Sequence, residues 1–168
     1  MHFGTGSTRG AGALEHPAAG ALVGVDRLVK DIRTGRFERT LSGLTAMAGV
    51  VTAAEIYFSH DAASFGNRMM WLPVVVNPLA SVAGVAGVFS RRAAKVALPI
   101  ASALVVANGL QGFYLHVRGI RQRPGGWSAD WETTRYNIET GPPLFAPLLV
   151  TVVGGMGLLA AVLRREED

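Results

Sequence analysis

Two histidines near the ends of apolar stretches are the residues best suited to chemistry in this chain. His60 follows the apolar run 41–58, and His116 lies near the end of the run 93–117. The two runs are the first and third of four, so they would cross a membrane in the same direction. Their C-terminal ends, and therefore both imidazoles, would lie on the same membrane side. Two neutral imidazoles on neighbouring helices can ligate a b-type haem, and a small residue such as Gly112 leaves room for the ring. One interpretation is therefore haem b with His60 and His116 as axial ligands.

Further polar residues are expected at the same membrane side. Asn108, Gly112 and His116 repeat every four residues, which places them on one helix face. In the haem interpretation, Asn108 and Gly112 line the cofactor. Asn77 lies at the depth of Asn108, about 12 Å below the outer membrane side at 1.5 Å per residue. Intramembrane polar groups are thus predicted to gather in the outer half of the membrane.

A carboxylate inside the first apolar run suggests a second kind of site. Glu55 lies about one turn from the end of that run, and a carboxylate in hydrocarbon is costly unless it is protonated, paired or hydrated. His60 and His116, with Glu55 or Asp61 and with Glu139 near by, could ligate a metal ion. The protein would then be a metal-dependent membrane enzyme. His60 lies five residues from Glu55, about 140° around a helix, so a shared face cannot be assumed.

A third interpretation gives both histidines a structural role. An imidazole side chain has both polar and apolar atoms, so it costs little energy at the end of a span. There it can form hydrogen bonds to the backbone of a loop. The residue pattern alone favours this interpretation. Ser59, His60 and Asp61 are adjacent in sequence, but neighbours at a helix end point in different directions and do not form a catalytic triad.

Composition and motifs exclude several other chemistries. The chain has no cysteine, which excludes disulfides, thiolate metal sites and iron–sulfur clusters. It has no nucleophile elbow, zinc-protease helix, phosphate-binding loop or calcium loop. Its basic residues alternate with apolar runs and form no long solvated patch, so nucleic acid is not an expected partner.

Four apolar runs must position these residues. Each has the length needed to cross a hydrocarbon core of roughly 30 Å, and each contains small residues four positions apart, which let helices approach closely in lipid. The sequence predicts an all-α polytopic membrane protein with four transmembrane helices in a compact bundle. This domain covers 39–168, with spans at about 41–58, 69–89, 93–117 and 142–163.

The remaining segments lie outside the four spans. Residues 1–20 are rich in glycine and alanine and are expected to form a flexible arm. Residues 21–38 have apolar positions at helical spacing, which predicts an amphipathic helix on the cytoplasmic membrane surface. The outer loop 118–141 contains Trp127 and Trp131. Its length predicts a short interfacial helix or, as we slightly favour, a surface for a partner.

The basic residues predict the orientation. One side of the four spans holds eleven of them and the other side holds five, so the positive-inside rule places both termini in the cytoplasm. The larger group is Arg9, Arg27, Lys30, Arg33, Arg36, Arg39, Arg91, Arg92, Lys95, Arg164 and Arg165, and the smaller is Arg68, Arg118, Arg121, Arg123 and Arg135.

The sequence favours a non-enzymatic role as an accessory or anchoring subunit of a larger membrane complex. The abundance of arginine and alanine suggests a bacterial protein, and hence the inner membrane. Its expected partners are the lipid bilayer and other membrane subunits or further copies of the chain. In size and number of spans it resembles four-helix membrane anchors and small redox subunits. One alternative is a haem b subunit that passes electrons between a quinone and a partner enzyme, and another is the metal-dependent enzyme.

Overall fold

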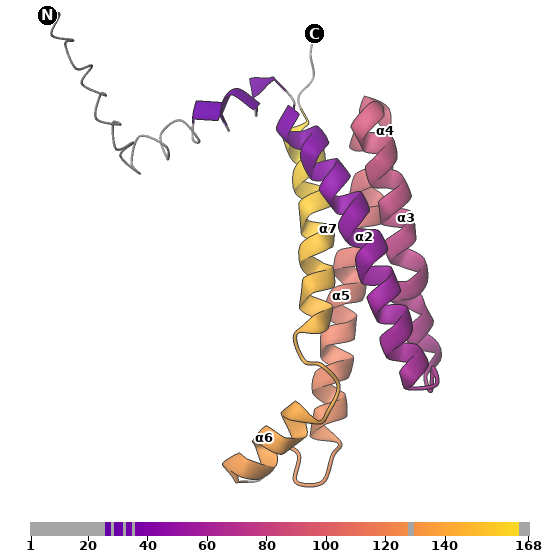
Figure 1. Cartoon of the computed structure of the whole chain (residues 1–168), viewed down its shortest axis with the longest axis vertical. Helices are drawn as coiled ribbons and strands as arrows, with labels where there is room; N and C mark the ends of the chain where they lie inside the picture. Colours follow the sequence, from indigo (N-terminus) through magenta and orange to yellow (C-terminus); the bar gives the residue numbers. More distant parts are fainter. Residues whose placement is uncertain (1–25, 28, 32, 35, 128–129, 165–168) are drawn as a thin grey trace, which may run out of the picture.

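Helices are the only regular secondary structure in the part of the chain that the structure describes. The computed structural model describes residues 26–27, 29–31, 33–34, 36–127 and 130–164, and these residues contain no strand. The elements are α2 (Arg36–Ala62), the 3-10 helix η1 (Arg68–Met70), α3 (Trp71–Phe89), α4 (Arg91–Lys95), α5 (Ala97–Arg121), α6 (Trp131–Glu139) and α7 (Ala146–Leu163) (Figure 1).

Four helical segments are long and apolar enough to cross a membrane. They are α2, η1 with α3, α4 with α5, and α7, and the shortest has 18 residues. Two helices extend beyond the expected spans. Helix α2 begins five residues before Leu41, and α5 continues to Arg121. His116 therefore lies inside α5 and not at its end.

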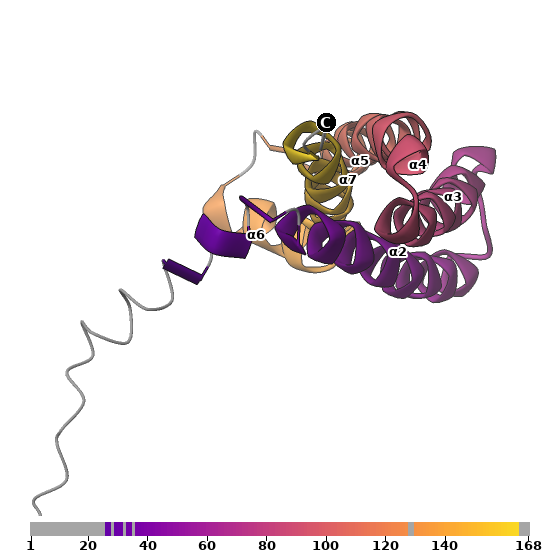
Figure 2. The same ribbon diagram turned by 90° about the horizontal axis from the view of Figure 1, so that it is seen from above.

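The four long helices surround a common axis in the order α2, α3, α5 and α7 (Figure 2). Helix α2 packs along α3, α5 packs along α7, and the two pairs meet through α2 with α7 and α3 with α5. Helices α2 and α5 are thus diagonal to each other. Helix α2 begins and α7 ends beside α4, whereas α6 lies at the opposite end. We call these the α4 end and the α6 end.

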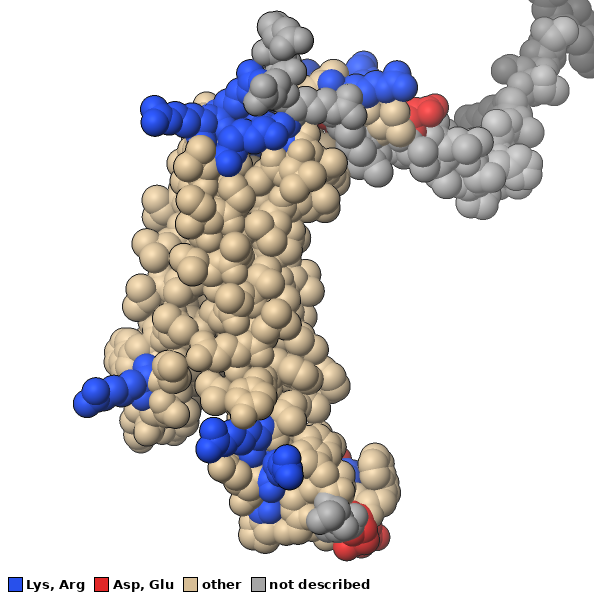
Figure 3. Space-filling model, turned by 180° about the vertical axis from the view of Figure 1, so that it is seen from behind, with Lys and Arg blue, Asp and Glu red and all other residues tan. Residues whose placement is uncertain are grey.

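The outer surface of the helices is apolar. Phe89 and Val162 are 84% and 77% exposed, while a cluster of smaller apolar side chains, including Ala80, Leu98 and Val105, is buried between the helices. Lysine and arginine gather at the two ends, with a band free of charged side chains between them on the face drawn in Figure 3. An apolar belt between charged ends is the surface that lipid requires.

Glycines set the close contacts between helices. In the α2–α3 pair, a Cβ on Gly84 would lie 2.7 Å from the Ser42 carbonyl oxygen. In the α5–α7 pair, a Cβ on Gly154 would lie 2.7 Å from the Ser102 carbonyl oxygen and 2.8 Å from the Val106 amide nitrogen. Backbone atoms cannot move aside as flexible side chains do, so these positions accept only glycine without helix displacement.

Adjacent glycines on α7 provide a matched test of this packing. Gly154→Ala should destabilise the protein by about 1–3 kcal/mol, the usual effect of overpacking, because its new methyl group meets the α5 backbone. Gly155→Ala should be neutral or slightly stabilising, since no atom of another described helix lies within 4 Å of its Cβ position. Thermal unfolding of both variants in detergent measures the difference, and equal melting temperatures would contradict the contact.

Two predicted segments are only partly comparable with the structure. The arm 1–20 lies outside the described residues, and so do residues 21–25, 28, 32 and 35 of the predicted interfacial helix 21–38. Within the latter, Arg36, Phe37 and Glu38 form the first turn of α2. The outer loop 118–141 contains the short helix α6.

Candidate functional site

A cavity of about 780 Å³ lies toward the α6 end, between α2, α5 and the beginnings of α3 and α7. Its volume is in the range of ligand and cofactor sites, roughly 300–1,000 Å³. Five of the candidate ligand and cofactor residues proposed from the sequence line it, namely Glu55, His60, Asn108, Gly112 and His116. Glu55 and His60 therefore border one space, despite their separation around α2.

His60 is held by the backbone of a neighbouring segment. Its Nδ1 lies 2.8 Å from the Met70 carbonyl oxygen. A carbonyl oxygen only accepts hydrogen bonds, so Nδ1 carries a proton in this contact and the lone pair of the neutral ring is on Nε2. No described residue provides a hydrogen-bond partner for Nε2.

The turn after α2 brings Met70 back to His60. Ser64 and Phe65 have positive φ angles of 55° and 44°, and the Phe65 amide donates to the His60 carbonyl oxygen at 2.9 Å. The Phe65 ring stacks on Trp71, with ring centroids 4.1 Å apart and planes inclined by 14°. Left-handed backbone at non-glycine residues costs energy, and the stacked rings help to offset that cost.

His116 is held in the same way by the segment before α7. Its Nδ1 lies 2.8 Å from the Pro143 carbonyl oxygen, so Nε2 again carries the lone pair of the neutral ring. Close packing of α5 against α7 supports this contact. A Cβ on Gly112 would lie 3.1 Å from Pro147 Cβ, and a Cβ on Gly119 would lie 3.2 Å from Pro142 Cγ. Helix packing thus accounts for Gly112 without any ligand.

The outer loop is a folded unit that positions Pro143. Asn137 is buried and donates from Nδ2 to the carbonyl oxygens of Pro124 and Gly126, at 3.0 and 3.3 Å. Arg123 donates to the Thr140 carbonyl oxygen at 2.7 Å. These bonds tie both sides of the loop together, so the loop holds the start of α7 against α5.

Asp130 caps α6 and gives the loop a pH dependence. Hydrogen bonds from the Thr133 amide and hydroxyl hold the pKa of Asp130 below its ordinary value. A depressed carboxyl pKa means that the stabilisation is complete above the unfolded value and is lost as pH falls through the lower folded value. We expect the protection factor of the Thr133 amide, its exchange rate relative to that of an unstructured peptide at the same pH, to fall below about pH 4, and Asp130→Asn to remove this pH dependence. Hydrogen exchange followed by NMR measures it, and a pH-independent wild type would contradict the cap.

The rest of the lining is mainly apolar with a few polar groups. Ile56, Leu115 and Val150 provide apolar walls. Asn108 is buried, and its amide has no hydrogen-bond partner among the residues that the structure describes. Arg118 also lines the cavity and is exposed. The cavity can therefore hold an apolar molecule that carries a few polar or anionic groups.

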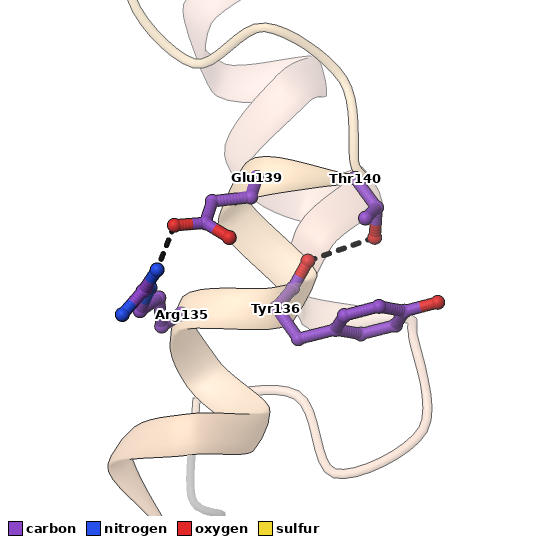
Figure 4. A network of polar contacts seen from close by, with 4 residues as sticks. All are labelled: Arg135, Tyr136, Glu139 and Thr140. Carbon is purple, nitrogen blue, oxygen red and sulfur yellow. Dashed lines mark hydrogen bonds and ion pairs between the residues drawn. The ribbon is translucent and has the colours of Figure 1, made fainter.

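Of the residues in the metal interpretation, Glu55, His60 and His116 line the cavity, whereas Asp61 and Glu139 do not. Glu139 accepts a 2.6 Å hydrogen bond from Arg135 on the exposed side of α6 (Figure 4), and this bond raises the pKa of Arg135 above its ordinary value. In the described part of the chain, no three His, Asp or Glu side chains come together in a group that could hold a metal ion.

Comparison with known proteins assigns no family. No protein-family model matches the chain, and no curated protein or solved structure matches it either.

Proposed function

We propose that this protein is a small integral membrane subunit of a larger membrane complex and that it carries a b-type haem between His60 and His116. The observation that supports this most is the shared arrangement of the two imidazoles. Each lines the cavity, and each has Nδ1 bonded to a backbone carbonyl 2.8 Å away. A backbone acceptor on one ring nitrogen orients the ring and raises the basicity of the other nitrogen, as it does for metal-ligating histidines.

The placement of the two helices also suits a planar ring. Helices α2 and α5 are diagonal, so a cofactor between His60 and His116 would occupy the space that α2 and α5 leave between them. Bis-imidazole haem needs no third protein ligand, so it is compatible with the absence of a three-residue metal cluster in the described chain. Arg118 at the cavity offers a cation for the haem carboxylates.

Haem titration tests this function directly. Detergent-purified protein depleted of cofactor should bind haem to saturation at one equivalent, with the absorption and electron paramagnetic resonance spectra of low-spin bis-imidazole iron. Non-saturating uptake with a high-spin spectrum would mean that haem only partitions into the micelle, and it would overturn the proposal.

The setting of this function is the bacterial inner membrane, with the α4 end in the cytoplasm. The proposal rests on the positive-inside rule and on the collection of basic residues from α2, α4 and α7 at that end. The cavity would then lie near the outer side, where the haem could pass electrons between a membrane quinone and a partner enzyme.

An anchoring role is supported by the outer loop. Trp131 is 73% exposed on α6, and Trp127 and Tyr136 are also exposed. Aromatic side chains are enriched where proteins bind one another, and here they project from a loop that internal hydrogen bonds hold in shape. A photo-crosslinking amino acid in place of Trp131 should capture a partner subunit in native membranes. An isolated monomer in gentle detergent, with no crosslinked partner, would contradict this role.

A further inference from the structure

A hollow on the outer loop lies apart from the cavity between the helices. It has a volume of about 750 Å³ and is lined by Val117, Arg121, Arg123, Gly125, Gly126 and Trp127, none of which lines the larger cavity. We call it the loop hollow. Its two charged residues are both arginines, and no acidic residue lines it. The loop hollow is therefore positively charged.

Internal contacts of the loop hold the loop hollow in shape. Arg123 donates to the Thr140 carbonyl oxygen at 2.7 Å, and its guanidinium carbon lies 5.9 Å from the centroid of the Tyr136 ring. Gly126 has a positive φ angle of 50°, and a Cβ there would lie 2.9 Å from the Arg121 carbonyl oxygen. The turn thus returns the backbone to the end of α5, directly before Trp127.

Arg121 is the cation in the loop hollow that the protein leaves unpaired. Its side chain is exposed and makes no hydrogen bond or ion pair to any residue that the structure describes. By contrast, Arg135 of the same loop is paired with Glu139 at 2.6 Å. A guanidinium group presents planar N–H donors that match the oxygens of a phosphate group. Arg121 and Arg123 together can therefore attract and bind a phosphate.

The loop hollow continues into the apolar surface of α5. Leu110, Tyr114, Val117 and Arg121 lie within about 60° of one another around a helix of 3.6 residues per turn. Leu110 and Tyr114 are 52% and 60% exposed. Over about 16 Å, at 1.5 Å per residue, this face changes from apolar to basic. On the face drawn in Figure 3, basic side chains gather directly beside the apolar surface of the helices.

We propose that the loop hollow binds the headgroup of an anionic phospholipid. Arg121 and Arg123 hold its phosphate, an acyl chain lies along Leu110 and Tyr114, and Trp127 lies at headgroup level, where tryptophan is enriched. A zwitterionic lipid is disfavoured, because its headgroup cation would lie near two arginines. Trp131, which we assign to a protein partner, does not line the loop hollow. The proposal rests on the membrane setting of the proposed function, and it requires neither haem nor a particular orientation.

Lipid titration followed by native mass spectrometry tests the binding. The full chain in detergent should bind phosphatidylglycerol more tightly than phosphatidylcholine. Arg121→Gln should weaken the binding of phosphatidylglycerol about tenfold, the usual effect of losing a hydrogen bond to a charged group. Arg68→Gln is the matched control, because Arg68 is an exposed arginine of the α2–α3 connection and does not line the loop hollow. This control should bind as the wild type does.

Thermal unfolding shows whether a loss of affinity is specific. Without lipid, Arg121→Gln should melt at the wild-type temperature, since the Arg121 side chain has no partner among the described residues. Phosphatidylglycerol should raise the melting temperature of the wild type more than that of the variant, because a ligand of the folded state stabilises it. Equal affinity of the two proteins for phosphatidylglycerol, or equal wild-type affinity for the two lipids, would overturn the proposal.

Photolabelling tests where the lipid lies. The probe is phosphatidylglycerol with a diazirine on one acyl chain, present as a small fraction of phosphatidylcholine bilayers that contain the full chain. It should label residues 110–117 more strongly than the part of α3 around Val82, which is 69% exposed. Arg121→Gln should remove this excess. Equal labelling of both helices in the wild type would show that the lipid only surrounds the protein, and it would overturn the proposal.

The outcomes separate this proposal from haem binding. Specific binding of phosphatidylglycerol by a protein that takes up no haem would overturn the haem site and support the lipid site. Stoichiometric haem with no preference for phosphatidylglycerol would overturn the lipid site and leave haem binding intact.

Discussion

Replacing His116 by alanine should abolish stoichiometric haem binding. The imidazole is the ligand of one axial position, and no other described side chain that lines the cavity offers an equivalent nitrogen except His60. We expect haem occupancy to fall at least tenfold for His116→Ala, and to a similar extent for His60→Ala. The pyridine haemochrome assay on purified protein measures the occupancy.

Two comparisons make this result specific. His16→Ala removes a histidine from the predicted N-terminal arm and should leave occupancy unchanged. His116→Met keeps an axial ligand, so it should retain haem and raise the midpoint potential, because methionine–histidine ligation favours the reduced iron. Full occupancy and an unchanged low-spin spectrum in both alanine variants would exclude these residues as the ligands.

Filling the cavity should have the second largest effect. Ser59 lines the cavity one residue before His60, so the indole ring of Ser59→Trp would occupy space that a cofactor needs. We expect occupancy to fall about tenfold or more while the helices remain folded, since the cavity is large enough for the new ring. Absorption per polypeptide and circular dichroism together measure the two effects.

The neighbouring residue provides the matched control. Phe58 is 68% exposed and does not line the cavity, so Phe58→Trp adds a similar ring to the outer surface of the helices. This variant should bind haem as the wild type does. Equal occupancy in Ser59→Trp and Phe58→Trp would mean that the cavity is not where the cofactor binds.

The sequence is sufficient to predict the helical class and the four apolar helices. Length and hydropathy define these helices, because a span must supply about twenty apolar residues whatever its neighbours are. Their directions alternate because each span ends on the side where the next one begins. The same reasoning predicts that Glu55, His60, Asn108 and His116 lie on one membrane side and form a common site. The structure places all four around one cavity.

Other features depend on contacts that sequence spacing does not encode. The carbonyl groups of Met70 and Pro143 hold the two histidines, yet every residue has a carbonyl group, so nothing in the sequence distinguishes them. The internal bonds of Asn137 are equally invisible, although the turn-forming residues at 124–126 are a signal that the loop is folded.

Glu38 shows how a charged residue can mislead sequence analysis. It lies between Arg36 and Arg39, in a segment whose charged residues suggest a membrane surface. In the structure the chain has already entered α2 at this point, and Glu38 faces the interior of the four helices. Its burial depends on the start of the helix, which periodicity places only to within a few residues.

Haem content of the native protein tests the central claim most directly. The protein should be purified in mild detergent from membranes of cells that make haem, and its haem and polypeptide should be quantified in the same sample. The account predicts one haem b per polypeptide, with the spectrum of low-spin bis-imidazole iron. A protein that is folded, embedded in the membrane and free of haem under these conditions would contradict it.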